Sequence, residues 1–122
     1  MPLEFEALTG LIIGAAIEVH KILCPGFLEK IYENAMVIQL EKLGLKVERQ
    51  VEVIVKFDGK EVGRHRIDLL VSGHIVVELK AISDFEPVHF AIVRSYLRAM
   101  GLKHGLIINF AKTKVDARRV QA

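Results

Sequence analysis

The sequence predicts an α/β protein in which a mixed β-sheet is flanked by helices. Apolar residues recur at helical spacing over residues 8–43, in strand patterns over 47–81, and at helical spacing again over 87–100. A short apolar run, residues 106–110, follows the last helix. A strand reached through a helix can lie parallel to a central strand, whereas strands joined by tight turns pair antiparallel. We therefore expect one domain, residues 1–122, with both kinds of pairing in its sheet.

Two helices are expected first. The helix from about residue 8 ends near Leu23, because Pro25 and Gly26 continue a helix poorly. Its predicted buried residues are Leu8, Ile12, Ala15, Ala16 and Val19. A second helix, residues 27–43, is capped by Gly44. Its predicted buried stripe consists of Leu28, Ile31, Ala35, Ile38 and Leu43.

Three strands are expected next, over residues 47–57, 61–71 and 74–81. Asp58-Gly59 predicts the first hairpin turn, and Val51, Val53, Val55 and Phe57 are predicted to share one face. The third helix, residues 87–100, ends at Gly101 and presents Val88, Ile92, Ser95 and Tyr96 on one side. The polar, basic tail after Lys112 is predicted to form at most a last helical turn.

Composition limits the class of protein. The chain is 52% hydrophobic and 26% charged, which is typical of a globular protein. A single cysteine, Cys24, cannot form an internal disulfide and indicates a reducing compartment. No basic region precedes the first apolar stretch, and the longest such stretch, residues 11–17, is shorter than the roughly 20 residues of a membrane span. We therefore expect a soluble, cytoplasmic protein with no membrane partner.

The charge is distributed unevenly. Residues 1–61 contain seven Lys/Arg and ten Asp/Glu, or −3, whereas residues 62–122 contain ten and five, or +5. A basic second half suits a polyanion such as nucleic acid, although modest asymmetries of this kind are common.

The chemistry is expected at Asp68, Glu78 and Lys80. Glu78 and Lys80 are two residues apart in an otherwise apolar strand, so they share a face, where burying them is costly unless they are paired or bound. A two-residue turn at Ser72-Gly73 would place Asp68 opposite Val77, whereas a three-residue connection through His74 would place it opposite Glu78. The second register makes a site for Mg²⁺ or Mn²⁺, with Lys80 acting on water or phosphate. The alternative is a cross-strand ion pair.

The arrangement of Asp68 with Glu78-Leu79-Lys80 on the next strand resembles the PD-(D/E)xK nucleases, and Gly26-Phe27-Leu28-Glu29-Lys30-Ile31-Tyr32 resembles the GxxExxY family of that superfamily. Further stretches similar to that family occur at residues 17–21, 47–50, 68–71, 96–97 and 107–110. The resemblance implies a restriction-endonuclease-like αβββαβ core and adds Glu29 to the acidic site. The family usually has Gly at the position of Cys24, and often a Gln, which can contact Lys or phosphate, at the position of Ile92.

We therefore predict metal-dependent phosphodiester hydrolysis of nucleic acid, with DNA ahead of RNA. Asp68, Glu78 and Glu29 are the expected metal ligands, and Lys80 completes the catalytic set. Gln50, His89 and Arg94 are candidate substrate contacts, although each could equally be a solvated or packing residue. The alternative is a catalytically silent nucleic-acid-binding or protein-interaction module on the same fold. A homodimer is also plausible, because an open sheet leaves edge strands to protect.

Overall fold

The structure, a computed structural model, describes residues 5–122. Residues 1–4, which entered the argument against a signal peptide, lie outside this range. The elements are α1 (Glu6–Leu23), α2 (Glu29–Lys42), β1 (Val47–Phe57), β2 (Lys60–Val71), β3 (Ile75–Lys80), α3 (Pro87–Met100), β4 (His104–Asn109) and β5 (Asp116–Gln121). In the sheet the strands follow their chain order, with β3 and β4 parallel and the other neighbours antiparallel. The predicted α/β class and mixed sheet are confirmed.

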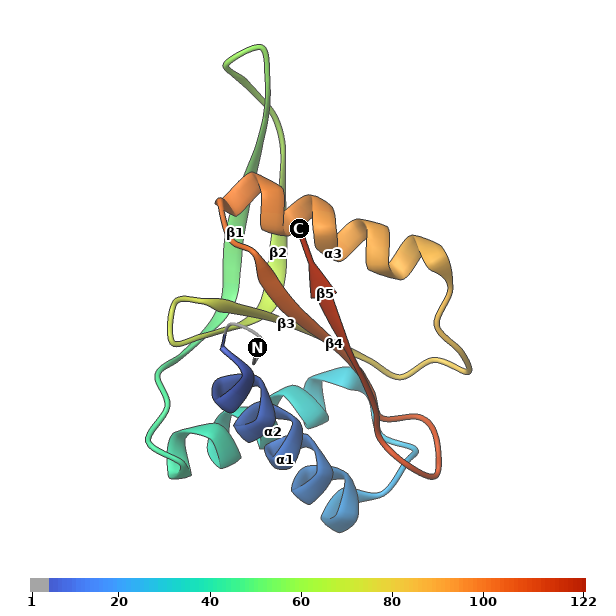
Figure 1. Ribbon diagram of the computed structural model, residues 1–122. Helices are drawn as coiled ribbons and strands as arrows, with labels where there is room; N and C mark the ends of the chain where they lie inside the picture. The colour runs from blue at the N-terminus through green and yellow to red at the C-terminus, as the bar shows by residue number, and fades with distance from the viewer. Residues whose placement is uncertain (1–4) are drawn as a thin grey trace.

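Helices cover both faces of the sheet, α1 and α2 on one side and α3 on the other (Figure 1). Alternate residues of β3 enter the two resulting cores. Val77 and Leu79 pack in the cluster that includes α1 and α2, whereas Val76 packs in the cluster that includes α3. Burial on both faces explains why β3 reads as a continuous apolar run.

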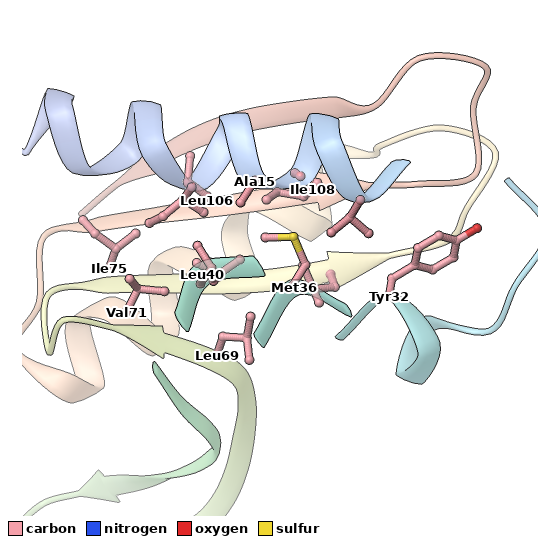
Figure 2. Close-up of a cluster of buried hydrophobic side chains, with 14 of the residues drawn as sticks. Ala15, Tyr32, Met36, Leu40, Leu69, Val71, Ile75, Leu106 and Ile108 are labelled. Carbon is pink, nitrogen blue, oxygen red and sulfur yellow. The ribbon is translucent and has the colours of Figure 1, made fainter. Parts of the chain in front are cut away.

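Helix α2 buries a different stripe from the one predicted. Tyr32, Met36 and Leu40 are buried together with Glu33, whereas Leu28, Ile31, Ile38 and Leu43 are exposed. The Tyr32 ring stacks on Phe110 at 4.6 Å, and its hydroxyl donates to the Cys24 carbonyl at 2.5 Å. Figure 2 shows Tyr32, Met36 and Leu40 on one side of α2, within the core. These contacts fix a rotation of α2 that the hydrophobic pattern alone did not distinguish.

The β1–β2 hairpin extends beyond the helices and forms a projecting arm (Figure 1). Of the apolar face predicted for β1, Val53 is buried and Val51 is partly buried in the α3 cluster, whereas Val55 and Phe57 are exposed. The predicted alternation is present, but none of the helices in residues 5–122 lies over the end of the arm to cover it (Figure 1).

The tail is a strand and not a helical turn. β5 pairs antiparallel with β4 along its whole length, and Val120 is buried in the α3 cluster. Its sequence, Asp-Ala-Arg-Arg-Val-Gln, has no strong strand propensity, so the pairing with β4 decides its conformation. Among the described residues, no helix is both long and apolar enough to cross a membrane.

The observed rotation of α2 can be tested with two neighbouring apolar residues. Leu40 is fully buried, whereas Ile38 is 63% exposed. We expect Leu40→Ala to lower the free energy of unfolding by about 2–5 kcal/mol, because it leaves a core cavity. Ile38→Ala should change it by no more than about 0.5 kcal/mol. Urea unfolding of both variants measures the difference, and equal losses would contradict the rotation described here.

Candidate active site

The β2–β3 turn has the register that the metal hypothesis required. Val71 pairs with Ile75, so residues 72–74 form a three-residue connection. Leu69 pairs with Val77, and the next position brings Asp68 beside Glu78. The choice between the two registers is therefore settled in favour of the one that unites the two acids.

Backbone pairing gives way to side-chain contacts at this position. The Leu79 amide donates to Oδ2 of Asp68 at 2.8 Å, and the Asp68 amide donates to Oε1 of Glu78 at 3.3 Å. The backbone pairing of β2 with β3 ends at Leu69 and Val77. Beyond that pair, each carboxylate accepts a hydrogen bond from a backbone amide of the neighbouring strand. These two bonds hold both acids in place on adjacent strands.

Both carboxyl groups are poorly solvated. Glu78 is only 7% exposed, and burial together with the nearby charge of Asp68 raises its pKa to about 8. Burial also raises the pKa of Asp68, with a contribution from Glu33, against the opposing effects of the Leu79 amide, Lys80 and Gln50. Two such acids side by side favour a shared proton or a cation over two free negative charges.

Lys80 lies beyond Glu78 on β3, half-buried. A cavity of about 110 Å³ connects the two with α3, and it is lined by His65, Glu78, Lys80, His89, Ile92, Val93 and Tyr96. The cavity brings His89, a predicted substrate contact, to the acidic site. It also includes His65, an exposed residue whose ring stacks on Tyr96 at 4.1 Å.

Asn109 fixes the chain that follows β3. Its buried amide accepts hydrogen bonds from the Ile82 and Ala111 N–H groups and donates one to the Ile82 carbonyl. The Phe110 amide donates to the Lys80 carbonyl at 2.9 Å. The parallel strand β4 therefore anchors the backbone on both sides of Ala81, and with it the position of Lys80. An Asn at the end of an apolar strand was the signal for this role in the sequence.

Glu33 of α2 is a member of the site that the sequence analysis missed. It is buried and accepts hydrogen bonds from Lys30, Arg49 and Gln50 at 2.6–2.9 Å. Although burial opposes them, these bonds hold its pKa below the usual value, so Glu33 stays ionised. Gln50 also lies close enough to Asp68 to lower the pKa of that carboxyl group, so it connects the two acids. Gln50 thus lies at the site, where its contacts are with protein side chains.

Glu29, which the family resemblance adds to the acidic site, is not buried. It is the first residue of α2 and is exposed, yet its charge is close enough to raise the pKa of Glu78 slightly. Arg94 does not line the cavity of Glu78 and Lys80. It lines a separate surface hollow of about 410 Å³ with residues that include Asp84, Lys112 and Arg118.

The acidic site offers oxygen ligands of the kind that a divalent cation needs. Within residues 5–122 no group of three or more His, Cys, Asp or Glu side chains is arranged as a ready-made metal site. Asp68 and Glu78 nevertheless supply adjacent carboxylates, and each has a second oxygen besides the one that accepts an amide. Two hard oxygen ligands completed by water are what Mg²⁺ commonly takes from a protein, so the residues fit.

Comparison with protein families gives the same assignment as the site. The family model described as the PD-(D/E)XK nuclease superfamily matches residues 6–120. The chain belongs to this superfamily. Within the matched range, Asp68 lies on β2, and Glu78 and Lys80 lie on the antiparallel strand β3.

The PD-(D/E)XK chain also resembles solved structures. The crystal structure of SSO0001 superposes with a TM-score of 0.61 at 15% sequence identity, covering 96% of this chain and 59% of that one. At this identity the likeness concerns the fold alone, and this chain spans under two thirds of that protein's length. A comparison with curated proteins found no match.

The raised pKa of Glu78 predicts how stability changes with pH. Native Glu78 keeps its proton up to about pH 8, whereas in the unfolded chain it loses the proton near its ordinary pKa of 4.5. The native state therefore binds more protons between these values, and stability falls as pH rises, by at most about 1.4 kcal/mol per pH unit for one proton. We expect Glu78→Gln to reduce this loss.

Urea unfolding from pH 5 to pH 8, without divalent cations, measures the effect. Glu41→Gln, on the exposed face of α2, is the matched control and should leave the pH dependence unchanged. A wild-type stability that stays level over this range would contradict the raised pKa.

Proposed function

We propose that this PD-(D/E)XK protein hydrolyses phosphodiester bonds in nucleic acid with the help of a divalent metal ion. The observation that carries the proposal is the meeting of Asp68 and Glu78, each fixed by a backbone amide, beside Lys80. DNA is proposed ahead of RNA because of the resemblance to restriction-endonuclease-like enzymes.

Asp68 and Glu78 would hold the ion, Mg²⁺ or Mn²⁺, and Glu29 would act from the first turn of α2 through bound water. When bound, such an ion lowers the pKa of a water molecule and offsets negative charge on the phosphodiester. The positive charge of Lys80 lowers the pKa of both Asp68 and Glu78, so it favours the ionised forms that bind cations. Its Nζ group would orient the attacking water or stabilise negative charge on the oxygens of the pentacovalent phosphoryl group.

His89 would donate a hydrogen bond to a phosphate oxygen. The Glu86 amide donates to Nδ1 of His89 at 2.8 Å, in the capping box that begins α3. In a neutral ring that bond requires Nδ1 to be the acceptor, so the proton resides on Nε2. A helix cap thus prepares an N–H donor on a side chain that lines the cavity of Lys80. Gln50 and Arg94 are retained as substrate contacts, the latter from its own hollow, in which Lys112 pairs with Asp84 and Arg118 pairs with Asp116.

A catalytically silent nucleic-acid-binding module is the second candidate, and one residue favours it. Ile92 lines the cavity at the position where the GxxExxY resemblance leads us to expect a polar Gln.

Assignment to that narrower family is itself part of the proposal, supported by Gly26, Glu29 and Tyr32. A single domain over residues 1–122 and a cytoplasmic location stay predictions from the sequence.

Cleavage assays test the enzyme proposal directly. Single- and double-stranded DNA and RNA are incubated with Mg²⁺, Mn²⁺ or EDTA, and we expect cutting of DNA that EDTA abolishes. Asp68→Asn and Lys80→Ala should each lower the rate by at least about 100-fold, because each removes charge at the reacting phosphate. Glu41→Gln and Lys42→Ala, exposed on α2, serve as controls of matched charge change. A folded wild type that binds DNA but cuts no substrate would favour the silent module.

Ile92→Gln tests the second candidate in the opposite direction. The new amide would lie beside Lys80 and Glu78, within the same cavity. If Ile92 limits catalysis, Ile92→Gln should raise the cleavage rate by roughly tenfold, a gain of the size of one hydrogen bond. Ile92→Leu keeps the site apolar and should cut no faster than the wild type. Equal rates for both variants would show that Ile92 is not the limiting feature.

A further inference from the structure

The outer edge of β1 is an exposed apolar surface. In the described part of the chain β1 pairs with β2 only and so forms one edge of the sheet. The projecting arm exposes Ile54, Val55, Phe57 and Val62, with Phe57 at 75%. A long apolar edge strand is a template for another strand, and soluble proteins usually cover or interrupt it.

The regular part of this edge has a natural centre. Gln50 and Asp58 both have left-handed backbone, with φ of 50° and 53°, and they bound the extended segment 51–57. The irregularity in the β1–β2 pairing lies between Val55–Gly63 and Lys56–Glu61, so the additional residue is Val62, on β2. The outer edge of β1 is therefore uninterrupted over seven residues, and Ile54 is its middle residue.

We infer that two copies of this chain pair antiparallel through β1, about a two-fold axis at Ile54. In this register Glu52 lies opposite Lys56 of the second copy, Val53 lies opposite Val55, and Ile54 lies opposite itself. Opposite charges facing each other stabilise an antiparallel pair. Moving the axis to Val53 or Val55 sets Glu52 or Lys56 opposite Ile54 instead and shortens the paired segment. The charges and the segment length thus select the same register.

A hollow beside β1 suits this pairing. It measures about 730 Å³ and is lined by residues 52–56 of β1 and by Arg98, Ala99 and Met100 at the end of α3. Opposed residues of an antiparallel pair share a face, so Val55 of the second copy lies on the side of Val53. Val53 is buried in the α3 cluster. The hollow beside Val53 would receive Val55 of the second copy, a side chain that is exposed in the isolated chain.

Disulfide trapping tests the axis. Opposed residues of antiparallel strands have Cα atoms about 4.5–5.5 Å apart, which a disulfide can span. In a Cys24→Ser background, Ile54→Cys should form an interchain disulfide at least tenfold faster than Val62→Cys. Val62 is more exposed than Ile54 but does not oppose itself, so random collisions would favour Val62→Cys instead.

Charge exchange tests the register. Glu52→Lys and Lys56→Glu each set like charges opposite one another, so each should raise the dimer dissociation constant by tenfold or more. In an equimolar mixture the introduced lysine of one variant faces the introduced glutamate of the other, and the two unchanged residues also face each other. The mixture should therefore recover wild-type affinity. Because Glu52 also binds Arg64 within one chain, circular dichroism checks that each variant is folded.

Sedimentation of the wild type gives the decisive outcomes. We expect a mass twice that of the chain, and a monomer for Ile54→Lys. A wild type that stays monomeric at about 100 µM overturns the inference. A dimer that survives Ile54→Lys also overturns it, since another surface must then be responsible. None of these measurements depends on cleavage, so they test the dimer independently of the proposed nuclease activity.

Discussion

The site depends on the place where β2 and β3 stop pairing. Backbone N–H groups near a buried strand separation need acceptors, and here Asp68 and Glu78 supply them. The same two bonds that satisfy the backbone place two carboxylates side by side on one face of the sheet. Fold and chemistry are therefore coupled at these atoms, because removing a carboxylate would leave a strand amide without its partner.

Helix α2 supports the site through Glu33 more than through Glu29. The ionised Glu33 carboxylate holds Gln50, and Gln50 in turn contacts Asp68. Gln50 has a left-handed backbone, which costs about 1 kcal/mol for a residue with a side chain and persists where other contacts hold it. On either side of this kink, Leu69 packs with the α1–α2 cluster and Ile67 with the α3 cluster. The change of packing partners lets the arm leave the body of the protein.

Much of the fold could be predicted from the sequence, because hydrophobic period is a local property. The length of the β2–β3 turn was not decided in this way: the sequence allowed two or three residues, and the pairing of Val71 with Ile75 selects the three-residue connection that brings Asp68 to Glu78. The rotation of α2 could not be predicted in the same way, since Leu28, Ile31 and Ile38 form an equally regular apolar stripe. β5 is a strand only because β4 offers an edge, a long-range effect that its own residues do not encode.

The distribution of positive charge separates the structural acid from the reactive ones. Glu33 is matched by Lys30 and Arg49, so its charge is balanced within the protein. Asp68 and Glu78 share Lys80, whose charge lowers the pKa of both. If both were ionised, two carboxylates beside one ammonium would leave net negative charge in a poorly solvated place, and a divalent cation would neutralise that charge better than a single proton. Residues of β3 pack in the apolar clusters on both sides of the sheet, and the free energy of that packing offsets the cost of placing unbalanced acidic groups on the strand.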